Sequence, residues 1–136
     1  MDIFQVHILA ADRTFYEGPC VSLHVPRRDG VVGMLAHQSA MIAAVQAGTL
    51  RYQPPEQEAR TAAISLGMVK VEKNEVLVLA DSVERPEEID EARARREADQ
   101  AREALLQKRS RQEHQVAQAT LARALNRLRV KALETR

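Results

Sequence analysis

The side chains best placed to do chemistry are four charged residues in the final third of the chain. Asp90 and Arg93 are three positions apart, and Arg123 and Arg127 are four apart. Residues at these spacings share one face of an α-helix, so each pair projects together. Two guanidinium groups one turn apart form a fork for phosphate oxygens, and an acid–base pair opposite them would complete a polar pocket. A simpler interpretation is also open: Asp90 and Arg93 form an exposed ion pair, and the arginines are solvated charges.

Motifs for catalysis or metal binding are hard to find. The sequence has no G-x-x-x-x-G-K-[ST] phosphate loop, no G-x-S-x-G elbow and no H-E-x-x-H motif. The four histidines lack metal-ligand spacing. His7 and His24 fall on the outward face of predicted strands, which favours hydrogen-bonded or solvated surface histidines, and no spacing requires Ser22 and His24 to form a triad. The pattern predicts no catalytic residue, no metal and no cofactor.

Helices must position the four charged residues, because the chain changes character at Pro86. All five glycines and all four aromatic residues precede it, and none follows it. Proline followed by acidic residues is typical of a helix start, so we expect Pro86 at the first helical position. Apolar residues then recur in two stripes, Ala94, Ala98, Ala101 and Leu105, and Leu121, Leu125, Leu128 and Ala132. The polar segment 107–114 predicts a turn between two antiparallel helices.

The first helical stripe consists mostly of alanine. Alanine allows close approach but buries little area, so at ~25 cal/mol per Å² the hairpin should hold itself together only weakly. Two interpretations stay open: the hairpin is a mobile element of low local stability, or it is a rigid, charge-covered pair of helices.

Residues 1–81 show the two-residue period of β-strands, one face buried and one solvated. The first segment illustrates it, with Phe4, Val6 and Ile8 alternating with polar residues. Segment 76–80 is apolar on both faces, like a central strand. Turn signals separate the apolar segments, and this regular spacing predicts an antiparallel sandwich or a flattened barrel.

Length and charge give a coarse division of the chain. Its 136 residues can form one ordinary domain, or a small domain with an appendage. Residues 1–85 contain 8 Lys or Arg against 10 Asp or Glu, a net charge of −2, whereas residues 86–136 contain 12 against 9, a net charge of +3. The basic end suits an acidic protein surface or a polyphosphate.

The single cysteine, Cys20, excludes an internal disulfide, and nothing indicates an oxidising compartment. The first residues lack a basic segment followed by an apolar one, and no run of about 18 apolar residues occurs. We expect a cytoplasmic or peripheral protein.

Four segments, taken in order, resemble one known family. They are the glycine-spaced turn Gly30-Val31-Val32-Gly33-Met34-Leu35-Ala36-His37-Gln38, the strand end Leu79-Ala80-Asp81, the hairpin opening Ile89-Asp90-Glu91-Ala92-Arg93-Ala94 and the helical segment Leu121-Ala122-Arg123-Ala124-Leu125-Asn126-Arg127-Leu128. Along essentially its full length the chain resembles the epsilon subunit of the bacterial rotary F-type ATP synthase. The ordered set carries the resemblance, since no single motif would.

The resemblance implies an α+β fold: an N-terminal antiparallel β-sandwich of about ten strands, then a C-terminal antiparallel two-helix hairpin. It implies that the sandwich, residues 1–85, docks on the gamma subunit and the c-subunit ring. The interface residues we expect are Gly30, Val31, Gly33, His37 and Gln38. The hairpin, residues 86–136, is expected to lie folded on the sandwich or to extend into the alpha/beta catalytic head, where it hinders ATP hydrolysis.

The resemblance further implies a non-catalytic rotor subunit of the central stalk that couples ATP synthesis to ion translocation. Such a subunit is held at the cytoplasmic face of the membrane only through the complex.

In family members that bind ATP, an I-D-x-x-R-A motif and two arginines of the second helix hold the nucleotide and favour the folded hairpin. The corresponding residues here are Ile89, Asp90, Arg93, Ala94, Arg123 and Arg127, with Glu84 as a further candidate. A ligand that binds only the folded state shifts the equilibrium towards it. ATP would then be a regulatory ligand and not a cofactor.

The sequence departs from the family pattern at several positions. Ala36 and Gln38 occupy the places of a usual proline and histidine, with His37 one position early. Val31 stands where some relatives carry an acid, and Gln100 where a basic residue sometimes helps to bind nucleotide.

Two other classes of function compete with the rotor subunit. A nucleic-acid-binding module would use the basic hairpin, but its arginines alternate with acids and no aromatic residue follows Pro86 to stack on bases. A small β-sandwich hydrolase would need a nucleophile and a base at a recognisable spacing, and the chain shows neither.

Overall fold

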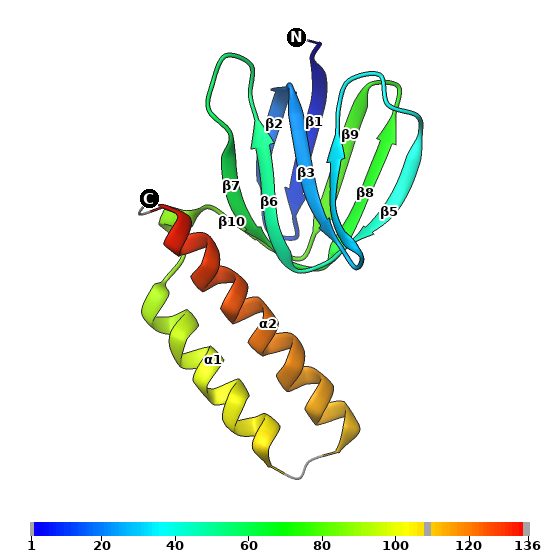
Figure 1. The fold of residues 1–136 in the computed structure, drawn as a ribbon. Helices are drawn as coiled ribbons and strands as arrows, with labels where there is room; N and C mark the ends of the chain where they lie inside the picture. Colours follow the sequence, from blue (N-terminus) through cyan, green and yellow to red (C-terminus); the bar gives the residue numbers. More distant parts are fainter. Residues whose placement is uncertain (1, 108–109, 135–136) are drawn as a thin grey trace. The chain divides into compact units, whose positions relative to one another are not determined.

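The computed structural model describes residues 2–107 and 110–134. The chain divides into two compact units, Met1–Arg85 and Pro86–Arg136. The first unit contains strands and the second contains helices (Figure 1).

Ten strands form two five-stranded sheets in the first unit (Figure 1). One sheet has the order β2 (Thr14–Cys20), β1 (Phe4–Ala10), β9 (Glu75–Ala80), β8 (Gly67–Glu72) and β5 (Met41–Val45). The other has the order β10 (Val83–Glu84), β7 (Arg60–Ile64), β6 (Gly48–Gln53), β3 (Ser22–Arg27) and β4 (Gly30–Met34). The predicted β-sandwich of about ten strands is confirmed.

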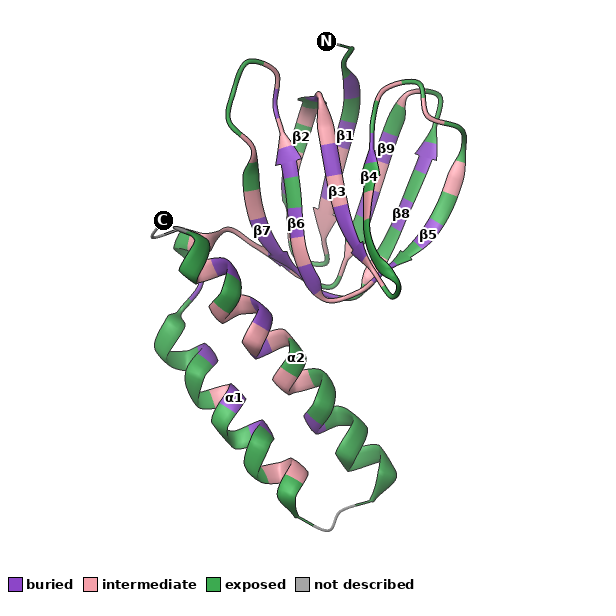
Figure 2. Ribbon diagram, viewed as in Figure 1, coloured by how far each residue is buried: buried purple, intermediate pink, exposed green. Residues whose placement is uncertain are grey.

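The core of the sandwich lies where the inward faces of the strands meet. Buried and exposed residues alternate along most strands (Figure 2). Phe4, Val6 and Ile8 of β1 are each at most 1% exposed, and Leu50 and Tyr52 of β6 are buried with them. The two-residue period seen in the sequence therefore identifies the core face of these strands.

One strand pair departs from the antiparallel prediction. β1 and β9 are parallel, with Val6 opposite Val76 and Ile8 opposite Val78, whereas the other pairs in both sheets are antiparallel. Parallel neighbours need a long connection, and here the seven intervening strands supply it. β9 has the central place that its apolar sequence predicted.

The helical unit begins with a one-turn 3₁₀ helix, η1 (Pro86–Glu88), and continues with α1 (Glu91–Leu106) and α2 (Arg111–Glu134). The prediction that Pro86 opens the α-helix was wrong, because Asp90 caps α1 four residues later. The predicted turn over 107–114 was too long, since α2 begins at Arg111. Ser110 explains this start: its hydroxyl accepts the Glu113 N–H at 3.2 Å. Residues 108–109 of that turn lie outside the described residues.

The two helices pack side by side and antiparallel (Figure 1). The predicted stripe of α1 is confirmed, with Ala94, Ala98 and Ala101 at most 4% exposed. On α2 the buried alanines are Ala117 and Ala124. The predicted leucine stripe is only half-buried and its last member, Ala132, is exposed. Methyl groups on both helices allow close approach, and leucines at the contact would hold the helices apart.

Candidate functional site

Asp90 and Arg93 are neighbours, but they do not form the ion pair that their spacing suggested. The Asp90 Oδ1 atom accepts the backbone N–H of Arg93 at 3.0 Å, which is the geometry of a helix N-cap. A carboxylate there satisfies an N–H group that has no partner within the helix. The guanidinium of Arg93 is therefore left to interact with another acid.

That acid is Glu97, which connects the two helices. Its Oε1 atom accepts the Arg93 Nε–H at 3.0 Å, and its Oε2 atom lies 3.5 Å from Nη1 of Arg127 on α2. The side chains of Glu97 and Arg127 are 28% and 26% exposed, so this contact is largely shielded from water. Arg93, Glu97 and Arg127 form a cluster that we call the arginine–glutamate bridge.

Arg123 lies one turn before Arg127 on α2, as predicted, but it makes a different contact. One of its terminal nitrogens donates to Thr120 Oγ1 at 3.3 Å, within the same helix. Arg123 is half-buried. The two arginines thus share one helix side, and of the two only Arg127 has an ion pair to Glu97 among the contacts described.

The remaining predicted nucleotide residues have different surroundings. Ile89 is 4% exposed and Ala94 is 2% exposed, so both are packing residues at the start of the hairpin. Glu84 belongs to β10 in the sandwich unit, opposite Ala63 of β7. The hairpin therefore brings together Arg93 and Arg127, through a residue that the sequence analysis did not select.

A groove of about 420 Å³ runs between the helices beside the arginine–glutamate bridge. Glu97 is one of its lining residues. The walls carry the apolar side chains of Ala101, Ala104, Ala117 and Val116, with polar groups from Gln100, Gln112, Glu113 and Thr120. A groove with alanine walls and a few polar groups, lined also by the glutamate that holds two guanidinium groups, can accept a flat apolar ring attached to an anion.

Three residues of this site were missed in the sequence. Glu97 follows Arg93 by four positions, a spacing typical of helical ion pairs, so a signal was present. Thr120 precedes Arg123 by three. Lys131 donates from Nζ to the Pro86 carbonyl at 3.1 Å and ties the end of α2 to η1; no local pattern indicates this contact.

The second predicted site, the interface group on the sandwich, divides between the two ends of β4. Gly30 opens the strand with a φ of +128°, a conformation that favours glycine, and Val31 is 65% exposed. Gly33 faces His24, whose Nε2 atom would lie 3.1 Å from an added Cβ. The Nδ1 atom of His24 is buried and has no hydrogen-bond partner in the described part of the chain, contrary to the expectation of a satisfied surface histidine.

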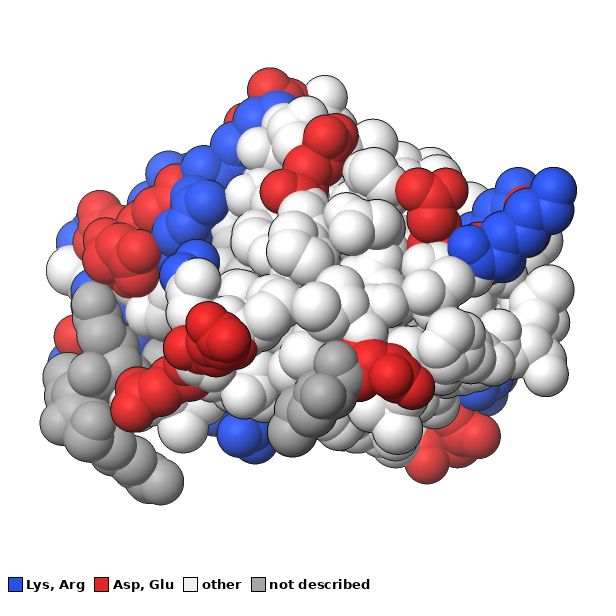
Figure 3. Space-filling model, turned by 90° about the horizontal axis from the view of Figure 1, so that it is seen from above, with Lys and Arg blue, Asp and Glu red and all other residues white. Residues whose placement is uncertain are grey.

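His37 and Gln38 lie beyond the other end of β4. His37 has a φ of +62°, its N–H donates to Asn74 Oδ1 at 2.8 Å, and its Nε2 atom is 3.6 Å from a carboxylate oxygen of Asp2. Gln38 accepts the Leu35 N–H at 3.3 Å. Figure 3, seen from above the view of Figure 1, shows broad uncharged areas between scattered charged side chains. The five predicted residues therefore extend from one end of β4 to beyond the other.

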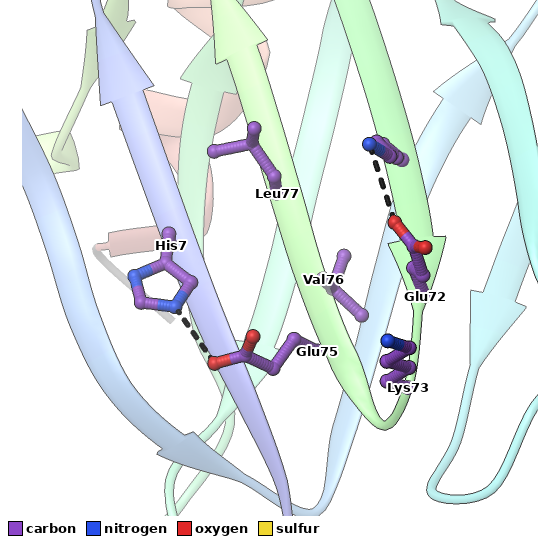
Figure 4. Close-up of a pocket in the computed structure, with 7 residues that line it drawn as sticks. His7, Glu72, Lys73, Glu75, Val76 and Leu77 are labelled. Atoms are coloured by element: carbon purple, nitrogen blue, oxygen red, sulfur yellow. Dashed lines mark ion pairs between the residues drawn. The ribbon is translucent and has the colours of Figure 1, made fainter.

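A shallow pocket of about 340 Å³ opens on β1, β8 and β9 around His7 (Figure 4). The His7 Nε2 atom lies 3.6 Å from Glu75, and Lys70 pairs with Glu72 at 3.3 Å. The other lining residues are Lys73, Val76 and Leu77, so the pocket carries no hydroxyl or thiol nucleophile. Its geometry is that of ion pairs on a sheet surface.

Within 2–107 and 110–134, no group of three or more His, Cys, Asp or Glu residues could hold a metal ion. None of the helices in this part of the chain is long and apolar enough to cross a membrane.

Comparison with protein families gives two adjacent matches. Residues 3–86 match the model described as ATP synthase, Delta/Epsilon chain, beta-sandwich domain. Residues 87–132 match the model described as ATP synthase, Delta/Epsilon chain, long alpha-helix domain.

Similar proteins are described as ATP synthase epsilon chains. The chain is 38% identical over 128 residues to the ATP synthase epsilon chain of Caldanaerobacter subterraneus subsp. tengcongensis, covering 93% of this chain and 92% of that one. It is 35% identical over 127 residues to the ATP synthase epsilon chain of Caldicellulosiruptor saccharolyticus, with the same two coverages.

Among solved structures, a chain of the Euglena gracilis mitochondrial ATP synthase, in its OSCP/F1/c-ring structure, superposes with a TM-score of 0.80 at 18% identity. The alignment covers 94% of this chain and 79% of that one. A chain of the Tetrahymena thermophila central stalk and c-ring superposes with a TM-score of 0.65 at 12% identity, over 93% and 95%. At these identities the likeness concerns the fold.

Proposed function

Because this chain belongs to the family of ATP synthase epsilon chains, we propose that it is a non-catalytic subunit of the rotor, and that its helical hairpin is a regulatory switch that responds to ATP. In this role the sandwich links gamma to the c-subunit ring at the cytoplasmic face of the membrane. The hairpin inhibits ATP hydrolysis when it extends into the alpha/beta head.

The docking role of the sandwich is supported by the spread of the predicted interface residues along β4 and beyond it. Gly30 and Val31 lie at one end of β4, and His37 and Gln38 lie beyond the other, so one sandwich can contact two partners at once. Val31 and Leu35 are more than 60% exposed, as apolar contact residues are before a partner covers them.

The switch role is supported by a firm anchor just before the hairpin. Arg13 donates to the Val83 carbonyl at 2.7 Å. Arg85 donates to the Phe15 carbonyl at 3.1 Å and stacks on the Phe15 ring at 4.5 Å. These contacts hold residues 83–85 on the sandwich, so movement of the hairpin would begin after Arg85.

The observation that carries the nucleotide proposal is the convergence of Arg93 and Arg127 beside the groove. Paired guanidinium groups bind phosphate oxygens in a fixed geometry, and the alanine walls of the groove suit a purine ring. The two arginines come from different helices. A ligand that bridges them therefore binds only the closed hairpin, in which α1 and α2 are packed together. Binding at 100 times Kd would stabilise the closed state by about 2.7 kcal/mol.

The inhibitory role is tested by truncating the subunit after Arg85. The truncated chain keeps both sheets and the anchor at 83–85. We expect the ATP synthase assembled with it to hydrolyse ATP faster than the intact complex and to retain gamma and the c ring. Unchanged hydrolysis in a fully assembled truncated complex would reject the inhibitory role.

The nucleotide role is tested by titrating the full chain with ATP while following its thermal unfolding and the compaction of the hairpin. We expect ATP to stabilise the native sequence and to lose its effect with Arg127→Ala. Arg129→Ala is the matched control, because Arg129 is an exposed arginine of the same helix. If millimolar ATP stabilises neither the native chain nor the Arg129 variant, the regulatory nucleotide is excluded.

A further inference from the structure

Glu97 occupies the place between Arg93 and Arg127 where an anion would bind. Both of its carboxylate oxygens are used, one by each arginine, at 3.0 and 3.5 Å. A phosphate oxygen placed between these two guanidinium groups would take the same donors. The carboxylate and a phosphate therefore cannot both hold the two arginines.

We propose that Glu97 is a built-in anion that closes the hairpin in the absence of ligand and competes with phosphate for the arginine pair. This inference rests on the proposed nucleotide role of the hairpin and adds to it a mechanism of regulation. A polyphosphate that enters the site displaces the Glu97 carboxylate from Arg93 and Arg127. The affinity for nucleotide is then set by the difference between the free energies with which the phosphate and the Glu97 carboxylate bind the two arginines. A weak response to ATP is therefore expected.

The neighbouring ion pairs of α1 show why Glu97 is distinct. Arg95 pairs with Glu91 and Arg102 pairs with Asp99, but both pairs lie within the one helix and each of these side chains is at least 52% exposed. Such contacts contribute little to stability. Glu97 is less exposed, at 28%, and reaches the second helix, so its contact changes when the hairpin opens.

The site also explains where the displaced carboxylate goes. Glu97 lines the groove between the helices, where Gln100 and Thr120 supply hydrogen-bonding groups. A glutamate has enough rotamers to turn away from Arg127 while α1 stays in place. Displacement therefore requires a side-chain movement and no refolding of the helix.

The experiment uses the full chain with Glu97→Gln and, as control, Asp99→Asn. Glutamine keeps the shape of the side chain and removes its charge. Asp99→Asn removes the same charge from the same helix at an exposed pair that does not reach α2. Inorganic tripolyphosphate and ATP are titrated into each protein by calorimetry, and hydrogen exchange of the α1 amides reports closure without ligand.

We expect Glu97→Gln to bind tripolyphosphate about five-fold more tightly than the native chain, the ratio that corresponds to about 1 kcal/mol for one charge contact. Without ligand, its α1 amides should exchange faster than those of the native chain. Asp99→Asn should match the native chain in both measurements. Arg127→Ala combined with Glu97→Gln should abolish the gain, since one of the two donors is then missing.

Three results would overturn the inference. If ATP binds the native chain and Glu97→Gln binds no more tightly, Glu97 does not compete, and the proposed nucleotide role stands. An equal gain with Asp99→Asn would show a general effect of net charge. If no variant binds either ligand at millimolar concentration, the inference and the nucleotide role fail together, and the docking role of the sandwich is unaffected.

Discussion

Replacing Ala98 by leucine should open the hairpin and so test whether close alanine packing holds it together. Ala98 is 1% exposed at the centre of the contact of α1 with α2. Its neighbours on α1, Ala94 and Ala101, are equally covered, and Ala117 and Ala124 face them from α2. The larger side chain has no space at this spacing of the helices.

The magnitude follows from how little these residues bury. At about 0.8 kcal/mol per buried methyl group, the five alanines together contribute roughly 4 kcal/mol. Overpacking a close contact costs about 1–3 kcal/mol, a large share of that total. A leucine that forces the helices apart would also expose the neighbouring methyl groups to water. We therefore expect the loss of stability to lie in the upper part of the range of about 1–3 kcal/mol.

The assay is thermal unfolding followed by far-ultraviolet circular dichroism, because both α-helices of the described residues lie in the hairpin. Ala92→Leu is the matched control, since Ala92 lies on α1 and is exposed. The Ala98 variant should lose helical signal at least about 5 °C below the control. In the assembled complex it should hydrolyse ATP more slowly, because a less stable closed hairpin populates the extended, inhibitory state. A midpoint equal to or above that of the control would refute the packing argument.

Two further predictions concern the sandwich. Gly67→Ala should lower the free energy of unfolding by about 3 kcal/mol or more, because the added Cβ would lie 1.9 Å from the Leu79 carbonyl oxygen. Urea unfolding measures this loss. Gly30→Ala has backbone strain at a φ of +128° but nothing within 4 Å of its Cβ, so a loss at Gly67 no greater than the loss at Gly30 would contradict the prediction. Tyr16→Phe tests a pH dependence, because burial, with a smaller effect of Cys20, raises the pKa of Tyr16 from 10.0 to about 12. As pH rises, Tyr16 loses its proton first in the unfolded chain. The contribution of protonated Tyr16 to the free energy of unfolding is therefore complete below pH 10 and is lost towards pH 12. At neutral pH the free energy of unfolding of the native chain should be about 1 kcal/mol higher than that of the variant, because Tyr16 donates a 2.7 Å hydrogen bond to the Pro19 carbonyl. This difference should shrink above pH 10. A difference independent of pH would show that the pKa of Tyr16 is not raised.

Local patterns predicted the parts of the fold that depend on neighbours in sequence. Alternation located the inward residues of β1, and the buried alanines of α1 followed from their spacing. The parallel pairing of β1 with β9 could not be predicted in this way, because it joins residues about 70 positions apart.

The candidate site shows a different limit of prediction from sequence: one spacing between two residues is compatible with more than one contact. Asp90 can pair with the Arg93 side chain or accept its N–H, and the structure has the second contact because a helix N-terminus needs an acceptor. The leucines of α2 made the stronger apolar pattern, yet alanines of α2 lie at the contact because the buried residues of α1 are alanines as well.

Two of the contacts that close the hairpin thus differ in their response to a ligand. The alanine contact is apolar and insensitive to ligands, and it contributes only a few kcal/mol. The bridge from Glu97 to Arg93 and Arg127 is ionic, so any anion that takes the arginines alters it. In the proposed switch, packing this weak lets a ligand that stabilises the closed hairpin by about 1–3 kcal/mol change which state of the hairpin predominates. A strongly packed leucine interface would remove that sensitivity, so the proposed switch would give the alanine stripe a functional reason as well as a steric one.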